Sequence, residues 1–168
     1  KEGYIPSRTF VIQATKVVMA KGVNAQAKEN GMNYSYYEGY YQRVDEIEKS
    51  ELKEKGIMPE PSIDNARQKD HFGYIFSGIM HVPESGVYEF MTRSDDGSVL
   101  YVNDTKVVDN DGSHAAIIAT GRIALSKGYH TYKLFYFEDY EGEHLSWLWK
   151  KPSAEEYETI PVENLFIN

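Results

Sequence analysis

The sequence predicts an all-β protein, an antiparallel β-sandwich or barrel-like fold with one short helix near residues 45–55. Short runs in which Val, Ile, Tyr and Phe alternate with polar residues recur along the chain, and Gly, Asn, Asp and Ser separate them. The fourteen Tyr residues add to this strand-forming content. Short strands at such spacing are typical of an antiparallel sandwich or barrel, and 168 residues suffice for one domain of this kind.

The first 30 residues differ from the rest of the chain. We expect Thr9–Ala14 to form a strand that ends an upstream domain, whereas the small, polar segment 20–31 lacks hydrophobic periodicity. The predicted division is therefore a linker with the tail of an upstream domain, residues 1–30, followed by a β-sandwich domain, residues 31–168. The alternative is that residues 1–30 are an integral part of the domain.

Residues 33–41 are dense in Tyr and are expected to open the domain as a strand interrupted at a glycine. The short helix follows. Asp45 is expected to begin a capping box, and Gly56 is the expected residue after the last helical turn. Ile47 and Leu52 should then face the core.

From residue 71 onward the pattern is almost wholly that of strands and turns. The expected strands are 72–81, 87–92, 99–102, 105–109, 116–125, 130–137 and 145–149, with a closing edge at 160–166. Strand 87–92 is expected to pair with strand 72–81 as a hairpin. Trp147 and Trp149 share one face of their strand and are expected in the core, because Trp buries a large area.

Composition excludes several function classes. The formal net charge is −8 and there is no basic stripe, so we expect no nucleic-acid partner. No apolar run reaches the ~20 residues of a membrane-spanning helix. The chain has no Cys, no nucleophile elbow and no phosphate-binding glycine loop, and its many acids do not single out a catalytic pair. We therefore predict that this fragment is not an enzyme.

The turn Ser94–Ser98 contains two adjacent carboxylates, Asp95 and Asp96, followed by glycine. Asp and Gly are turn residues, so the two side chains can cap backbone amides of their own turn. Two carboxylates at one loop tip can also begin a site for a hard cation such as calcium. Both interpretations stay open at this point.

Several short motifs occur in an order that resembles the protective-antigen (PA14) domain family. They are Tyr34–Gly39, Gly86–Phe90, Ser94–Ser98 with Leu100–Val102, Val107–Gly112 with His114, Gly121–Leu125, Gly128–His130 and Leu145–Trp147. The resemblance runs from about residue 31 to the end of the chain. It implies a β-sandwich or barrel-like fold that occurs in bacterial glycosidases, yeast adhesins, proteases and toxins, mostly outside the cytoplasm.

The opening motif Tyr34–Gly39 is similar to modules attached to bacterial glycoside hydrolases, including β-hexosaminidases. The resemblance therefore implies a covalently attached catalytic domain upstream, such as that of a β-N-acetylhexosaminidase, and an extracytoplasmic location: periplasmic, cell-envelope or secreted. It also implies a role for the paired aspartates. In the adhesin branch, two matching carboxylates joined by a cis peptide bind calcium, which in turn holds sugar hydroxyls.

Asp95 and Asp96 match those two carboxylates, so the resemblance makes them metal ligands as well as carbohydrate-binding residues. The adhesins add an Asn side chain from a later loop, whereas the matching loop here, 138–144, has four carboxylates and no Asn. Asp111, His114 and Tyr140 complete the expected carbohydrate-binding set. Tyr140 is a candidate for stacking on a sugar ring, and His114 is otherwise a hydrogen-bonded loop residue.

The resulting hypothesis is a non-catalytic accessory module of a larger glycoside hydrolase, with carbohydrate as partner and Ca²⁺ as a candidate cofactor. The alternative is a structural spacer or protein-interaction domain without a small-molecule site. Convergence of the loop tips around Asp96, Asp111 and Tyr140 on one patch would favour binding, and tips that splay apart would favour the spacer.

Overall fold

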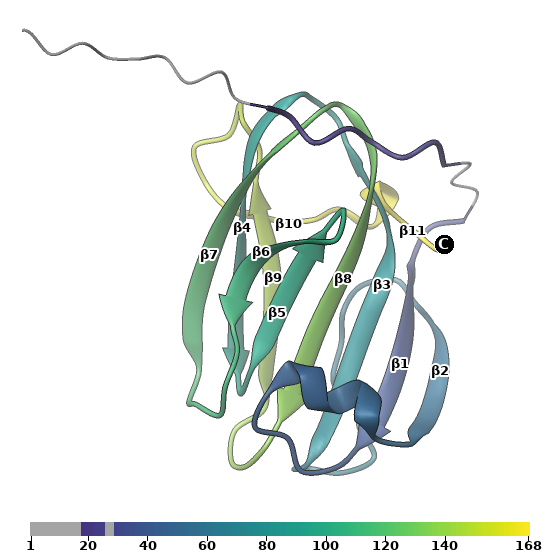
Figure 1. Ribbon diagram of the computed structural model, residues 1–168, viewed down its shortest axis with the longest axis vertical. Helices are drawn as coiled ribbons and strands as arrows, with labels where there is room; N and C mark the ends of the chain where they lie inside the picture. The colour runs from purple at the N-terminus through teal and green to yellow at the C-terminus, as the bar shows by residue number, and fades with distance from the viewer. Residues whose placement is uncertain (1–17, 26–28) are drawn as a thin grey trace, which may run out of the picture.

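The computed structural model describes residues 18–25 and 29–168, and it confirms the predicted all-β sandwich. Two antiparallel sheets pack face to face without closing into a barrel (Figure 1). The expected strand Thr9–Ala14 lies outside the described residues.

The larger sheet has the strand order β2-β1-β3-β8-β5-β6, and β11 pairs with the end of β3. Its strands are β1 (Met32–Glu38), β2 (Leu52–Met58), β3 (Phe72–Val82), β5 (Ser98–Val102), β6 (Thr105–Asn110), β8 (Gly128–Glu138) and β11 (Leu165–Phe166). The smaller sheet has the order β10-β9-β4-β7. Its strands are β4 (Gly86–Asp95), β7 (Ile117–Leu125), β9 (His144–Lys150) and β10 (Glu158–Thr159).

The main core lies between the sheets and is built from side chains that follow the two-residue period of a strand. Tyr132, Leu134 and Tyr136 of β8 face inward from the larger sheet and are buried. Trp147 and Trp149 of β9 face them from the smaller sheet, at 4% and 1% exposure, so the prediction that both belong to the core is confirmed.

A second, smaller core lies on the outer face of the larger sheet. The 3₁₀ helix η1 (Val44–Lys49) covers this face and buries Ile47 against residues of β3 and β8, among them Ile75 and Phe135. β3 is consequently covered on both faces, which explains why residues 72–76 are all buried.

The predicted helix over 45–55 is only half right. The helix ends at Lys49, and residues 52–58 form the edge strand β2. Leu52, expected in the core, is 44% exposed, and Gly56 lies inside β2 opposite Tyr34. A helix continued to residue 55 would leave the edge of β1 without a partner, and pairing that edge satisfies its backbone groups.

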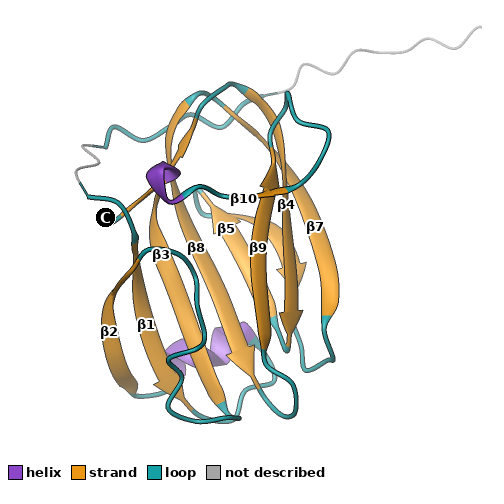
Figure 2. Cartoon of the chain, turned by 180° about the vertical axis from the view of Figure 1, so that it is seen from behind, coloured by secondary structure: helices purple, strands orange, loops and turns teal. Residues whose placement is uncertain are grey.

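The predicted hairpin of 72–81 with 87–92 is wrong, because β3 and β4 belong to different sheets. Both edges of β3 are taken, by β1 and by β8, so β4 crosses the sandwich and pairs with β7 and β9. In this arrangement both β3 and β4 still turn their apolar faces toward the core between the sheets. The loop between β2 and β3, which packs Ile63 and Ala66 against the core, runs beside the start of β9 (Figure 2).

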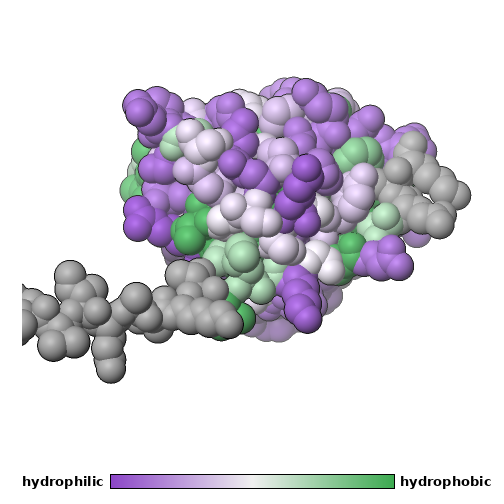
Figure 3. Space-filling view, turned by 90° about the horizontal axis from the view of Figure 1, so that it is seen from above, coloured by the Kyte–Doolittle hydropathy of each residue, from purple (hydrophilic) through white to green (hydrophobic). Residues whose placement is uncertain are grey.

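Residues 18–25 run across one end of the sandwich (Figure 1). The amide of Ala20 donates to the carbonyl of Ala124 at 2.8 Å, and the amide of Val23 donates to that of Tyr129 at 2.7 Å. Seen from this end, the surface is mostly hydrophilic with scattered apolar groups (Figure 3). The division of the chain at residue 30 stays a prediction. Within the described part of the chain, no helix is long and apolar enough to cross a membrane.

Candidate functional site

Three loops meet at the end of the sandwich opposite residues 18–25, and Asp96 lies at their centre. They connect β4 to β5, β6 to β7 and β8 to β9, and they lie together with η1 at the lower end of the molecule in Figure 1. Asp96 is 2% exposed. The loop tips around Asp96, Asp111 and Tyr140 therefore lie at the same end of the sandwich, which is the arrangement expected of a binding domain.

The Asp96 carboxylate joins the other two loops through four hydrogen bonds. Its Oδ1 accepts from the amide of His114 at 2.6 Å and from the Ser113 hydroxyl at 3.1 Å. Its Oδ2 accepts from the amides of Asp139 at 2.7 Å and Tyr140 at 3.3 Å. The side chain thus caps backbone amides, as one of the two interpretations expects, but the amides belong to neighbouring loops rather than to its own turn.

Asp95 precedes Asp96 across a cis peptide bond and is 9% exposed. Its Oδ2 accepts from the amide of Ala116 at 2.9 Å, and its backbone carbonyl accepts from the Tyr136 hydroxyl at 2.6 Å. Among the described residues no donor reaches Asp95 Oδ1, so this oxygen remains free to bind a ligand. Gly142 of the β8–β9 loop lies directly above Asp95, where a Cβ atom would come within 3.0 Å of Oδ2.

Glu138 is a third carboxylate in the same place, and the sequence interpretation missed it. Oxygens of Asp95, Asp96 and Glu138 lie within 4.8 Å of one another. Glu138 was assigned to the acidic loop, yet it is the last residue of β8 and is fully buried. The two-residue period of β8 could have revealed this position, because residue 138 lies on the same face of the strand as the buried Tyr136.

Burial and the nearby Asp96 and Asp95 carboxylates raise the pKa of Glu138 to about 8. The Tyr136 hydroxyl, 3.1 Å from Glu138 Oε2, lowers the pKa, and Oε1 has no hydrogen-bond partner in the part of the chain that the structure describes. No Lys, Arg or His side chain within the described ranges forms an ion pair with any of the three carboxylates. Three buried acids therefore share a small space without a compensating cation from these parts of the chain.

The other predicted site residues have structural partners. Asp111 accepts hydrogen bonds from the amides of Val44 at 2.9 Å and Gly112 at 3.0 Å, and it forms an ion pair with Arg43 at 2.9 Å. It therefore fastens the start of η1 to the β6–β7 loop. The His114 ring lies within hydrogen-bonding distance of the carbonyls of Asn110 and Ala115, both at 3.0 Å.

Two exposed tyrosines flank this centre. Tyr140, a predicted sugar-stacking residue, is 64% exposed while its amide is held by Asp96. Tyr40, which was not predicted, is 80% exposed and stacks on the His71 ring with centroids 4.0 Å apart. His71 Nδ1 lies 3.8 Å from the Asp139 carboxylate, which also accepts from Gln42 Nε2 at 3.0 Å. The β1–η1 loop is thus part of the same surface.

A PA14 domain model matches residues 28–163 of the sequence. The chain belongs to the PA14 domain family. This assignment confirms the resemblance inferred from the order of motifs, and no curated protein sequence matches the chain.

Solved structures show the same fold. This PA14 domain is similar to an anti-sigma factor domain-containing protein, with a TM-score of 0.71 and 23% identity over 83% of this chain and 49% of that one. It is similar to a "PA14 sugar-binding domain from RTX adhesin", with a TM-score of 0.69 and 18% identity over 84% and 100% of the two chains. It is also similar to the A domain of epithelial adhesin 6 from Candida glabrata in complex with Galb1-3GlcNAc, with a TM-score of 0.64 and 15% identity over 90% and 92%. The chain spans about half the length of the anti-sigma factor domain-containing protein.

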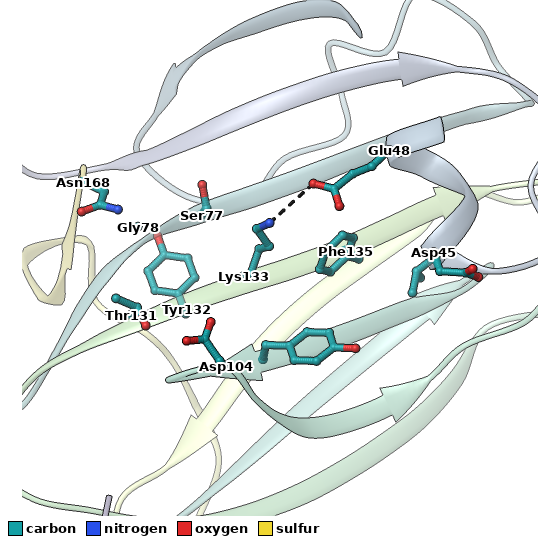
Figure 4. Close-up of a pocket in the computed structure, with 12 residues that line it drawn as sticks. Asp45, Glu48, Ser77, Gly78, Asp104, Thr131, Tyr132, Lys133, Phe135 and Asn168 are labelled. Carbon is teal, nitrogen blue, oxygen red and sulfur yellow. Dashed lines mark hydrogen bonds and ion pairs between the residues drawn. The ribbon is translucent and has the colours of Figure 1, made fainter. Parts of the chain in front are cut away.

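Two hollows mark the surface of this PA14 domain. One, of about 520 Å³, lies between the β2–β3 loop and the start of β9 and is lined by Glu143 and His144, so it adjoins the carboxylate centre. The other, of about 650 Å³, is an open depression on the outer face of the larger sheet, where the Lys133–Glu48 pair bridges it (Figure 4). None of the predicted site residues lines this second hollow, so we place the candidate site at the loop end.

Proposed function

We propose that this PA14 domain is a non-catalytic carbohydrate-binding module that meets a glycan at the loop end of the sandwich. The observation that carries the proposal is the convergence of three loops on the buried Asp96 carboxylate, which holds both following loops by their amides. Two structures of similar fold are described as a sugar-binding domain and as an adhesin domain in complex with a disaccharide.

The proposal includes a calcium ion bound by Asp95 and Asp96. Calcium prefers six to eight oxygen ligands, and the free Asp95 Oδ1 beside two further buried carboxylates fits that preference. When bound, the ion would supply positive charge to coordinate sugar hydroxyls. The chain's own residues orient the glycan: Tyr140 offers an exposed ring to the apolar face of a sugar, and Asp96 fixes the loop that carries this ring.

The proposal extends to the parent protein. The opening motif Tyr34–Gly39 resembles modules of bacterial glycoside hydrolases. We therefore place this module in an extracytoplasmic glycoside hydrolase, such as a β-N-acetylhexosaminidase, with the catalytic domain attached upstream. The module would bind the substrate chain or shape the approach to the catalytic cleft.

Glycan-array binding followed by isothermal titration calorimetry, with calcium and with chelator, tests the proposal. We expect binding that requires calcium and is weakened by Tyr140→Ala. Tyr129→Ala is the matched control, because Tyr129 lies near the other end of β8. If no glycan binds in either condition, the module is a spacer or a protein-interaction domain. Binding unaffected by chelator would remove calcium from the proposal and leave carbohydrate recognition intact.

A further inference from the structure

We propose that Glu138 is a direct ligand of the cation, so that the metal centre of this domain is a buried cluster of three carboxylates rather than the aspartate pair alone. This inference rests on the metal-binding part of the proposed function and not on the glycan. It follows from the hydrogen bonds around Glu138.

The Tyr136 hydroxyl cannot satisfy Glu138, because it has one proton and two acceptors. Its oxygen lies 2.6 Å from the carbonyl of Asp95 and 3.1 Å from Glu138 Oε2. The shorter contact is the better hydrogen bond, so the proton points toward Asp95. Glu138 Oε1 has no hydrogen-bond partner among residues 18–25 and 29–168, although the side chain is fully buried. A buried carboxylate without hydrogen-bond donors is stable only when it binds a cation or takes up a proton.

The arrangement of the carboxylates fits calcium. Calcium–oxygen distances are about 2.3–2.6 Å, so two ligands on opposite sides of the ion are about 4.6–5.2 Å apart. The three carboxylate oxygens lie within 4.8 Å of one another, so a small inward movement of the side chains at most brings all three into contact with one calcium ion. Magnesium holds opposite ligands about 4.0–4.2 Å apart and retains its waters, so we expect it to bind more weakly.

The remaining oxygens show why Glu138 is needed. Both Asp96 oxygens already accept two hydrogen bonds each, so Asp96 is the weakest of the three ligands and cannot hold the ion with Asp95 alone. Asp95 Oδ1 and Glu138 Oε1 have no hydrogen-bond donor among the described residues. A cation in the cluster would be held mainly by these two carboxylates, while Asp96 contributes a weaker contact and continues to hold the loops.

Calcium titration and terbium luminescence of the isolated domain, both without sugar, test this inference. Terbium replaces calcium at oxygen sites and is excited through nearby aromatic rings, here Tyr136. We expect Glu138→Gln to lose at least about tenfold in calcium and terbium affinity, because affinity at such sites depends on the number of charged ligands. Its melting temperature in chelator should be no lower than that of the unmutated domain. Glu141→Gln is the control, since Glu141 is an exposed acid of the adjoining loop, and its affinity should be unchanged.

Equal affinities for Glu138→Gln and the unmutated domain would overturn the inference. So would the absence of any calcium or terbium binding by the unmutated domain, because Glu138 would then be held by a proton alone. If Glu138→Gln does not fold, crystals of the unmutated domain soaked in terbium decide the question. A cation within about 2.6 Å of a Glu138 oxygen supports the inference, and a cation farther than about 3.5 Å contradicts it. Failure of glycan binding in the separate array and calorimetry experiments would bear on the proposed function and not on this site.

Discussion

The carboxylate of Asp96 accepts a hydrogen bond of 2.6 Å from the backbone amide of His114, 18 residues further along the chain. A second oxygen of the same group accepts from the amide of Asp139, 43 residues away. One side chain thus sets the relative position of three loops. The binding surface therefore depends on a buried polar contact rather than on the loops' own conformational preferences.

Asp96→Ala should reduce the free energy of unfolding by about 2–4 kcal/mol, because it leaves three backbone amides at the loop end without their acceptor. Denaturant unfolding measures the change. The control is Asp45→Ala, which removes an exposed pair with Lys49 and should leave the free energy of unfolding almost unchanged, because water screens such a pair. Similar losses in both variants would contradict the anchoring role.

The stability of the domain in chelator should fall as the pH rises toward 8. The folded state keeps the Glu138 proton up to a pKa of about 8, whereas the unfolded chain releases it near 4.5. Between these values the folded state binds the extra proton, so the free energy of unfolding decreases with pH by at most about 1.4 kcal/mol per unit.

Gln at position 138 does not titrate. The free energy of unfolding of Glu138→Gln should therefore not decrease with pH in this range on account of residue 138, while the other groups titrate as before. Urea unfolding at several pH values between 5 and 9 compares the two proteins. A parallel pH dependence in both would show that Glu138 is not protonated in the folded state.

Tyr40→Ala should weaken the binding of an extended glycan by about threefold to tenfold without lowering stability, because the ring is 80% exposed and its loss removes a stacking surface. Tyr129→Ala is a matched control. Tyr129 packs on His81 much as Tyr40 packs on His71, but on the part of β8 farthest from the site. Titration calorimetry with the tightest glycan from the array gives both affinities. If the two variants bind alike, Tyr40 is no part of the surface that contacts sugar.

Gly121→Ala should destabilise the fold by about 3 kcal/mol or more. A Cβ atom on Gly121 of β7 would lie 1.6 Å from the carbonyl oxygen of Val107 in β6, so the edges of the two sheets could no longer approach each other. The neighbouring Thr120→Ala, on the exposed side of β7, should cost no more than about 1 kcal/mol. Thermal unfolding of the two variants measures the difference, and equal melting temperatures would refute the close approach.

Much of the architecture could be read from local patterns. The expected strand 130–137 is β8, and its two-residue period places Tyr132, Leu134 and Tyr136 on one face; the same period continued by one step places Glu138 on that buried face. The expected strands 99–102 and 105–109 leave Asn103 and Asp104 between them as a turn, and both residues have the positive φ that such short polar turns adopt. These features depend on residues adjacent in the sequence.

Strand pairing could not be read in this way. The prediction of a hairpin between 72–81 and 87–92 failed because β1 and β8 occupy both edges of β3, and neither of these strands is its neighbour in the sequence. The helix is shorter than predicted for a similar reason. Residues 52–58 pair with β1 as an edge strand, and this pairing is not visible in the local sequence.

The sequence by itself therefore determined most of the strands and the position of the aspartate pair, because these follow from local periodicity and turn chemistry. Only the tertiary structure decided which strands are neighbours and that Glu138 joins Asp95 and Asp96. Contacts between residues 40 or more positions apart depend on how the two sheets pack, and no local pattern encodes that packing.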